Sequence, residues 1–524
     1  MRAPCDEAVM QSAAKRSPTE AVARNWILVA TILGSSMAFI DSTVVNVALP
    51  AIQSNFHSTV VGMQWVVESY GLFLGALILV GGSLGDLFGR RLIFVIGVAI
   101  FTIASAACGA AFSIHQLNAA RSIQGIGAAL LVPGSLAIIS TAFDGKSRGQ
   151  AIGTWSGFTA ITTAIGPVLG GSLVEHASWR WVFFINVPLA GAVIVISFWK
   201  IPESRNAKAC RVDWLGALLA TAGLGGLVAG FMESVNTGWR NPLVIGGLMV
   251  GFGCLILFIF SESKVTTPML PLALFKSSSF SGANLLTLFL YSAIGVFFFL
   301  FPLNLIQVQH YSATAAGAAV LPLILLMFFL SRWSGGLVAR YGARRPLIAG
   351  PLIAALGFAM FMAPLRAESY WKTFFSAIVV LGFGMAVTVA PLTTVVMNSV
   401  SQERVGAASG INNAVARVAG VLAIAILGIV MVKVFGSRLN EKLTHLSVSP
   451  SVVQQLQQDE IKLAGLPVPD GLDPNVKRTI HDFIEEAFVS GFRVVMMICV
   501  GLSVASAVAA WLMIQKEPDQ ARAA

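Results

Sequence analysis

Charged residues are scarce in this chain. Aspartate, glutamate, lysine and arginine make up 11% of its 524 residues, whereas soluble domains carry roughly 25%. Hydrophobic residues make up 56%, and the mean hydropathy is +0.80. A soluble enzyme, a disordered chain and a nucleic-acid-binding module are therefore poor interpretations, and we expect most of the chain to face lipid or other apolar helices.

Cysteine and histidine are also few. The five cysteines form no CxxC pair and do not cluster with any of the six histidines, so we expect neither a disulfide framework nor a metal site. The sequence shows no nucleophile–base constellation either, which argues against an enzyme. Residues 1–25 are polar and lead into an apolar segment that is too long for a signal peptide, so we expect them to remain as a cytoplasmic tail.

Long apolar runs fill the rest of the chain. About fourteen of them are long enough to cross a hydrocarbon core of about 30 Å. Their approximate limits are 26–50, 60–84, 92–113, 117–141, 150–174, 181–200, 214–233, 242–260, 279–306, 314–338, 346–363, 373–397, 406–434 and 488–514. The sequence therefore predicts an all-α membrane protein.

Lysine and arginine are distributed unequally between the predicted loops. If the N-terminus is inside, the cytoplasmic segments carry 20 of them and the six short outer loops carry four. This asymmetry follows the positive-inside rule, and an even number of spans returns the C-terminus to the cytoplasm. The net charge of +10 therefore reflects membrane topology, and no nucleic-acid partner is implied.

A weak internal repeat divides the spans. Gly89 and Arg91, after the second span, recur at the same offset as Gly342 and Arg344, after the tenth. Duplicated six-helix halves are typical of transporters whose substrate site lies between the halves. The predicted units are a cytoplasmic tail (1–25), a six-helix half (26–200), two inserted spans (201–261), a second six-helix half (262–514) containing an extracytoplasmic segment (435–487), and a cytoplasmic tail (515–524).

Three ionisable residues fall inside predicted spans at similar depths. Asp41 lies in the outer half of the first span, where a carboxylate is costly and can bind and release a proton. Arg121 begins a stretch of small residues in the fourth span, so we expect it to face other helices and to pair with Asp41. Glu68, in the second span, is a candidate for a second proton site or a contact for a cationic substrate, or it lines a water-filled vestibule. The alternative for Asp41 is a structural carboxylate capped by Ser42, Thr43 or a neighbouring helix, and the alternative for Arg121 is a side chain that reaches outward to the lipid headgroups.

Two glycine-rich segments suggest moving or closely packed parts. Residues 81–91 form the turn after the second span, and they contain Gly85, Asp86, Gly89 and Arg90. The glycines permit a tight turn, and the acid can bond to neighbouring cationic groups or helix N-termini. The fifth span contains Gly166, Pro167, Gly170 and Gly171, a pattern that suits close helix packing and a kink. In the thirteenth span, Arg417 is expected to be buried, with a partner that the sequence does not identify.

Together these motifs resemble the major facilitator superfamily, specifically the fourteen-helix drug:proton antiporters. The resemblance covers nearly the whole chain and is carried by the Asp41 motif, the 81–91 loop, the Arg121 motif and the glycines of the fifth span. It implies the major facilitator fold and efflux of lipophilic drugs or antibiotics in exchange for protons, driven by the proton-motive force without a bound cofactor. It also implies a location in the cell (inner) membrane.

By position, the resemblance makes Asp41 the proton-binding carboxylate and Arg121 its coupling partner. It makes Asp86 and Arg90 an inner gate. Thr162, where the antiporter motif usually has a glycine, and Ala339, where the second half lacks the acid matching Asp86, depart from the family pattern.

Other functions remain open at this point. A proton-coupled uptake symporter, or an exporter of an endogenous metabolite, would share most of these features. A non-transporting membrane receptor would leave the intramembrane charges without a task. An adaptor protein or an outer-membrane channel has no support in the sequence.

Overall fold

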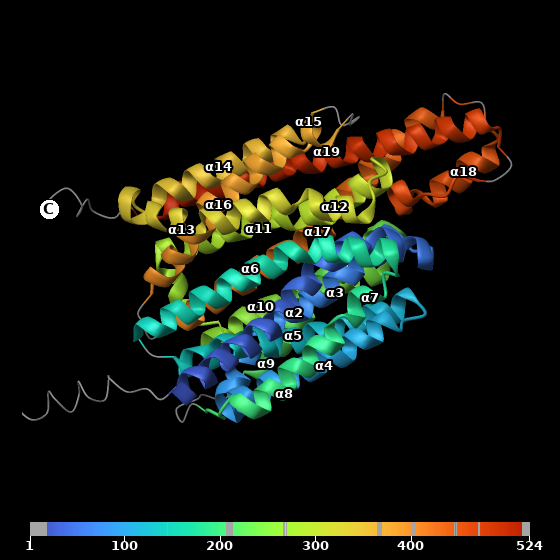
Figure 1. The fold of residues 1–524 in the computed structure, drawn as a ribbon. Helices are drawn as coiled ribbons and strands as arrows, with labels where there is room; N and C mark the ends of the chain where they lie inside the picture. The colour runs from blue at the N-terminus through green and yellow to red at the C-terminus, as the bar shows by residue number, and fades with distance from the viewer. Residues whose placement is uncertain are drawn as a thin grey trace, which may run out of the picture.

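The computed structural model describes residues 18–143, 145–205, 213–265, 268, 270–363, 369–400, 405–444, 446, 448–469 and 472–515. Every regular element within these ranges is helical. The long helices run along a common axis, and both ends of the described chain lie at one end of the bundle, which we call the tail face (Figure 1). The opposite end, which carries α18, is called the cap face.

The first half of the chain builds six spans. They are α2 (Pro18–Phe56), α3 (Val60–Phe88), α4 (Arg90–Gly109), α5 (Ile114–Ala142), α6 (Gly145–His176), and α7 (Trp181–Phe184) with α8 (Asn186–Lys200). Local sequence sets these limits: the side chains of Thr59 and Ser113 accept hydrogen bonds from the first turns of α3 and α5. Gly89, with φ of +125°, separates α3 from α4.

The second half of the chain is organised in the same way. It contains η1 (Leu272–Lys276), α11 (Ser278–Leu303), η2 (Asn304–Val308), α12 (Ala313–Ala319), α13 (Leu321–Tyr341), α14 (Arg344–Met360), α15 (Tyr370–Thr373), α16 (Phe375–Asn398), α17 (Val405–Leu443) and α19 (Pro474–Met513). The break between α12 and α13 at Val320 precedes Pro322, which has no amide proton to continue the helix.

The number of spans agrees with the sequence. Thirteen stretches of the described chain are long and apolar enough to cross a membrane. The one predicted span missing from these thirteen, 346–363, corresponds to α14, which has 17 residues and is about 26 Å long at 1.5 Å per residue. The protein is therefore an all-α, multi-pass membrane protein with about fourteen spans.

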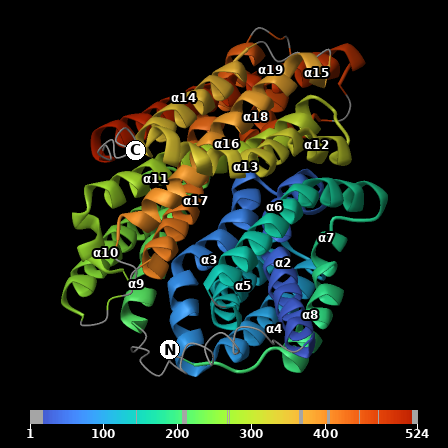
Figure 2. The same ribbon diagram turned by 60° about the vertical axis from the view of Figure 1, so that its left-hand side comes forward.

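Two further helices, α9 (Trp214–Thr237) and α10 (Pro242–Lys264), lie between the halves in sequence and at one side of the bundle (Figure 2). They pack closely through glycines, since a methyl group at Gly226 would lie 2.7 Å from the Gly247 carbonyl oxygen. One side of α9 also contacts α3 and α17. The apolar side chains of Leu243, Met249 and Ile256 on α10 are exposed, as expected for a helix that faces lipid.

A small cap stands on the cap face between α17 and α19. The segment 435–487 was predicted to be extracytoplasmic, but α17 continues to Leu443 and α19 begins at Pro474, so the cap itself spans 444–473. It contains α18 (Pro450–Gln458) and η4 (Glu460–Gly465). Leu456 and Leu463 are buried, so the cap packs against the protein through its own apolar side chains.

Helix α6 makes its tightest contacts with the second half toward the cap face. At the cap end, the Thr314 amide donates to the Glu175 carboxylate across the contact with α12, at 3.3 Å. Nearer the tail face, a methyl group added at Gly157 of α6 would make only an ordinary contact with Phe328 of α13, and methyl groups added at Gly153 or Gly335 would meet no atom within 4 Å. On this side of the bundle, the two halves are therefore packed most closely toward the cap face.

Candidate functional site

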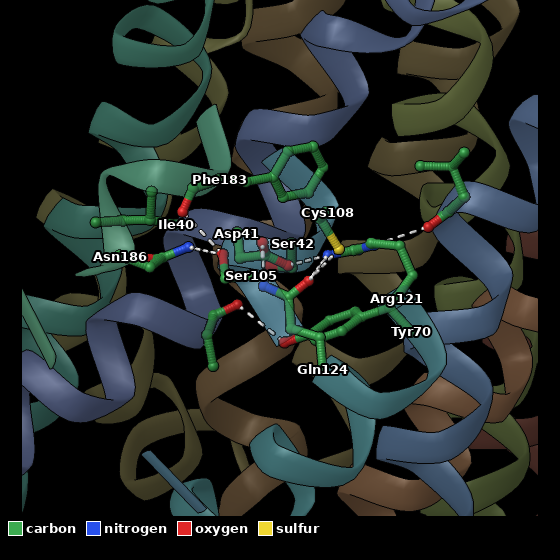
Figure 3. A network of polar contacts seen from close by, with 12 residues as sticks. Ile40, Asp41, Ser42, Tyr70, Ser105, Cys108, Arg121, Gln124, Phe183 and Asn186 are labelled. Atoms are coloured by element: carbon green, nitrogen blue, oxygen red, sulfur yellow. Dashed lines mark hydrogen bonds and ion pairs between the residues drawn. The ribbon is translucent and has the colours of Figure 1, made fainter. Parts of the chain in front are cut away.

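Asp41 of α2 and Arg121 of α5 form an ion pair within the membrane-spanning part of the first half (Figure 3). The Arg121 Nη1 atom lies 2.5 Å from Asp41 Oδ2. The Asp41 side chain is fully buried, and the Arg121 side chain is 1% exposed. The structure thus brings together two of the three intramembrane ionisable residues that the sequence singled out.

Neighbouring groups bind further polar atoms of this pair. Gln124, one helical turn after Arg121, donates from Nε2 to Asp41 Oδ1 at 2.8 Å and accepts from Arg121 Nη1 at 2.8 Å. The Arg121 Nε atom donates to the Val66 carbonyl of α3 at 2.9 Å. Both carboxylate oxygens of Asp41 therefore have a donor, which offsets part of the cost of burying its charge. We call Asp41, Arg121 and Gln124 the charge network.

Aromatic and polar side chains enclose the charge network. The Arg121 guanidinium lies 4.3 Å from the centre of the Tyr70 ring and 5.9 Å from that of Phe183, so cation–π attraction adds to the ion pair. On the far side, Asn186 donates to Ser105, which donates to the Phe183 carbonyl, at 3.0 and 2.8 Å. This dry surrounding strengthens the electrostatic attraction between Asp41 and Arg121.

The geometry makes a proton and Arg121 competitors for the same carboxylate. While the pair is closed, water does not reach the Asp41 carboxylate, and its two oxygens are occupied by Arg121 and Gln124. Any group that binds this carboxylate has to displace Arg121 or Gln124 from it. Because the network joins α2 to α5, proton binding can be coupled to helix movement.

Glu68 lies near the charge network in depth but does not join it. It is fully buried, and neither of its carboxyl oxygens has a hydrogen-bond partner among the described residues. The neighbouring Val66 carbonyl and Tyr70 ring contact Arg121, whereas Gln64, one turn before Glu68, contacts α17. Glu68 therefore does not line an open vestibule in this conformation.

The tail-face turn between α3 and α4 is held by charge. Arg90 contacts Asp86 through two nitrogens, with Nε 2.9 Å and Nη2 2.7 Å from Oδ1. Gly89 is required by its positive φ and by space, because a methyl group there would lie 2.7 Å from the Glu203 carboxyl group. Gly85 has more room, since an added methyl group would make only ordinary contacts with Arg90.

Glu203 also belongs to this turn, although its position in the sequence does not mark it as a functional residue. Its two carboxylate oxygens accept hydrogen bonds from the Arg91 and Leu92 amides, each at 3.1 Å, at the first turn of α4. A negative charge at this position also interacts favourably with the helix dipole. The only signal in the sequence was faint: Glu203 is the one acid in the basic segment 200–212.

The glycine motif of the fifth span contacts both halves of the protein. Methyl groups at Gly166 and Gly170 would overlap Thr43 and Val44 of α2, whereas one at Gly171 would overlap the Ala313 carbonyl of α12. The Pro167 carbonyl, in turn, leaves no room for a side chain at Gly317 of α12. This part of α6 is therefore packed between α2 and α12 at the closed, cap-facing end.

Arg417 was expected to be buried with a partner. It is half-buried on α17, where its Cβ atom packs against Gly75 of α3. It makes no hydrogen bond or ion pair with the described residues. Tyr70 and Tyr291 lie within electrostatic range of its guanidinium.

The described residues contain no group of three histidine, cysteine or acidic side chains that could hold a metal ion. Cys108, Cys254 and Cys499 are free thiols. Cys108 contacts Gln124 of the charge network, with the sulfur 3.6 Å from Oε1. The chemistry available at the site is therefore that of a buried carboxylate, a guanidinium and their hydrogen bonds.

Known membrane transporters are similar to this chain over nearly its whole length. A sequence profile of the Major Facilitator Superfamily matches residues 31–213 and 214–424. The multidrug resistance protein Stp of Mycobacterium tuberculosis is 34% identical over 92% of this chain and 91% of its own. The tetracenomycin C resistance and export protein of Streptomyces glaucescens is 31% identical over 95% of this chain and 93% of its own. The puromycin resistance protein pur8 of Streptomyces alboniger is 31% identical over 98% and 95%, respectively.

Solved structures of transporters share the fold. A bacterial homologue of the human lysosomal transporter Spinster, in an inward-facing and unoccupied conformation, superposes with a TM-score of 0.65 at 17% identity, covering 96% of this chain and all of its own. A D-xylose–proton symporter superposes with a TM-score of 0.60 at 13% identity, covering 94% and 98%.

Proposed function

Because the chain belongs to the major facilitator superfamily, we propose that it exports lipophilic drugs or antibiotics across the cell membrane in exchange for protons. The observation that carries the proton coupling is the buried pair of Asp41 and Arg121. The names of the relatives, which are multidrug and antibiotic resistance proteins, support the substrate class.

In this proposal Asp41 binds the transported proton and Arg121 reports its protonation. Protonation of Asp41 weakens its attraction to Arg121, which keeps its contacts with Gln124 and the Val66 carbonyl. The link between α2 and α5 loosens, and the halves can rearrange around the central site. Loss of the proton restores the pair.

The contacts of α6 support alternating access between the two halves. The Gly171 and Gly317 packing closes the cap-facing end, and separation of the halves there would open the site to the other side of the membrane. We assign the tail face to the cytoplasm, in keeping with the positive-inside rule. Asp86, Arg90 and Glu203 then hold a cytoplasmic turn that moves with the first half.

Proton entry supplies enough free energy for useful export. At a driving force of about 150 mV, one proton provides roughly 3.5 kcal/mol, which supports a gradient of about 300-fold for a neutral substrate. The function needs no bound cofactor. Its partners are protons, a lipophilic small molecule and the lipid bilayer.

The proposal can be tested in cells that lack their own efflux pumps. Cells expressing the protein should accumulate less of a fluorescent lipophilic cation than control cells, and a protonophore should abolish the difference. Asp41→Asn should accumulate as much as control cells at matched expression. Glu441→Gln is the matched control, since it removes an exposed acid whose ion-pair partner among the described residues is Arg438. Normal export by Asp41→Asn would refute the assignment of the proton site.

A further inference from the structure

Glu68 lies where the two halves of the protein meet. On α3, Gln64 donates to the Ile424 carbonyl of α17 at 3.0 Å. A methyl group at Gly71 would contact Val421 of α17 at 3.0 Å, and one at Gly75 would contact Arg417 at 3.2 Å. Residues three or four apart share one face of a helix, so Glu68 lies on this same face of α3. We call the contact between α3 and α17 the seam.

The inserted helix α9 closes the third side of the seam. Val61 of α3, Val228 and Met232 of α9, and Val421 and Ala425 of α17 form one apolar cluster. Along α3, this cluster borders Glu68 on both sides. Val61 belongs to the cluster on the cap side, and on the tail side Val421 of the cluster lies next to Gly71. Water is therefore excluded from the carboxyl group by three helices, one of which belongs to the inserted pair.

Charged residues on the surrounding elements do not pair with Glu68. Asp41 and Arg121 bind each other on the opposite face of α3. Arg417 packs two turns nearer the tail face, at Gly75, and Glu233, the only charged residue of α9, accepts a hydrogen bond from Asn236. The other charged or titratable groups with described side chains on the elements packed against α3 are Lys433, Arg438, Glu441 and Lys442 of α17, Glu460 and Lys462 of η4, Arg24 of α2, Arg90 and Arg91 of α4, and His115 of α5. None of them forms an ion pair with Glu68 within the described chain.

An ionised carboxylate at this position would have neither a counterion nor a hydrogen bond. Burying such a charge costs far more than burying the neutral acid, so a closed seam holds Glu68 protonated. When the cap ends of α3 and α17 separate, the same carboxyl group meets water and can ionise. Protonation of Glu68 and closure of the seam are therefore linked, because each favours the other.

We propose that Glu68 is a second proton-binding residue, which permits the seam between α3, α9 and α17 to close only after it has taken a proton from the cap side. The proton passes from water to a carboxylate oxygen, which becomes the O–H group of the buried acid. Ionised Glu68 holds the cap end open, and this prevents return of the transporter without a proton. This inference rests on the alternating access of the proposed function, and it gives the inserted helix α9 a role as the third wall of the site.

The test measures conformation in the absence of any drug. Nitroxide labels at Phe112→Cys and Trp371→Cys, both exposed at the cap face of opposite halves, would report cap opening by pulsed electron paramagnetic resonance in lipid nanodiscs. Cys5, Cys210 and Cys254 would be replaced by serine. As the pH is raised, the ratio of open to closed molecules in the parent protein should rise, and Glu68 should contribute up to about tenfold per pH unit to this rise, the limit for one linked proton.

Three variants decide the outcome. Glu68→Gln, which mimics the neutral acid, should lose the contribution of Glu68 and be more closed than the parent at high pH, whereas Glu68→Asp should keep the full pH response. Glu233→Gln, which removes the acid of α9, should behave like the parent. A parent-like pH response in Glu68→Gln would overturn the proposal. If Glu68 controls cap opening but the protein exports no drug, the proposed function fails and this inference stands. If drug is exported and cap opening does not depend on Glu68, this inference fails and the proposed function stands.

Discussion

Single residues in this protein are held in place by charge burial. Arg121 contributes three contacts to a dry interior, and its loss would leave the Asp41 carboxylate without a counterion. Removing one partner of a buried ion pair costs about 3–5 kcal/mol, whereas removing both can be nearly neutral. A buried ion pair is therefore recognised by a single substitution that costs more stability than the double substitution.

We therefore expect Arg121→Met to lower the free energy of unfolding by about 3–5 kcal/mol. The double variant Asp41→Asn/Arg121→Met should recover most of this loss, because no uncompensated charge remains. Thermal unfolding of the purified proteins in detergent, compared at one pH, measures both effects. A double variant less stable than Arg121→Met would contradict the account of the pair.

Several residues at the site could be predicted from the sequence, and others could not. Position along the spans placed Asp41 and Arg121 at one depth. The Val66 carbonyl carries no side-chain signal, so its contact with Arg121 could not be foreseen. Glu68 was predicted as a candidate because it lies deep within a span. The helix that it faces could not be predicted, because α3 is apolar on every side and its pattern does not show which neighbour each residue contacts.

At the scale of elements, glycines decide how closely helices and turns approach. The structure distinguishes glycines that need their lack of a side chain from those that do not. Gly89 combines a positive φ with a carboxylate where a methyl group would stand, whereas Gly85 is helical and has room. Both glycines belong to the sequence motif, which does not show which of them is needed, because the Glu203 side chain that packs on Gly89 lies more than a hundred residues away in the sequence.

Gly89→Ala should therefore destabilise the protein by more than about 1 kcal/mol, from backbone strain and from displacement of Glu203. Gly85→Ala should be neutral or slightly stabilising, since alanine favours helix by about 1 kcal/mol over glycine. Melting temperatures and drug efflux, measured side by side, test the difference. Equal effects of the two substitutions would show that the turn does not need the Gly89 geometry.

The packing of α6 gives a second matched pair. Gly171→Ala places a methyl group against the Ala313 carbonyl of α12 and should push the cap-facing contact apart. Gly153→Ala adds the same methyl group where no atom lies within 4 Å. We expect efflux to fall at least about tenfold in the first variant, for a loss of 1.4 kcal/mol or more in the closed state, and to stay near normal in the second. A transport assay at equal expression suffices, and normal efflux by Gly171→Ala would refute a need for this contact.

The whole molecule consists of two halves that meet along α3 and α17 and along α6 and α12. Run length and loop charge predicted the spans and their number, since these depend on composition alone. Within the predicted outer segment 435–487, the hydropathy pattern did not show where α17 ends and α19 begins, because both helices extend beyond their apolar runs by polar turns. The closeness of the halves at the cap face depends on contacts distant in sequence, which hydropathy does not show.

The cap joins the two halves through hydrogen bonds. Gln53 of α2 donates to the Lys462 carbonyl of the cap at 3.1 Å and accepts from Gln307 of the second half at 2.8 Å. Gly465 also packs on the Gln53 side chain. These contacts must break if the cap face opens during transport.

A disulfide between Gln53→Cys and Gly465→Cys should therefore block efflux under oxidation, and a reductant should restore it. The control is a disulfide between Gly436→Cys and Glu460→Cys, which ties the cap to its own half, where Gly436 packs on Glu460. It should leave efflux near normal. Efflux that continues through the first cross-link, with its formation verified by mass shift, would show that the cap does not separate from α2.

The stability of the cap should depend on pH through Glu460. Burial raises the pKa of Glu460 above its usual value, although a hydrogen bond from Asn440 opposes this shift. The folded cap thus binds a proton more tightly than the unfolded chain, so this residue favours the folded cap at low pH, and its contribution is lost as pH rises through the folded pKa. In Glu460→Gln, cap stability measured by hydrogen exchange should lose this dependence on pH.

Proton movement through Asp41 should be visible in inverted membrane vesicles. Their luminal pH can be followed with a pH-sensitive dye while lipophilic cations and antibiotics are added in turn. These compounds should alkalinise an acidified lumen when the vesicles carry the parent protein, and they should have no effect with folded Asp41→Asn at equal amount. An equal response from both proteins, or further acidification with the parent protein, would show that Asp41 does not couple protons to export.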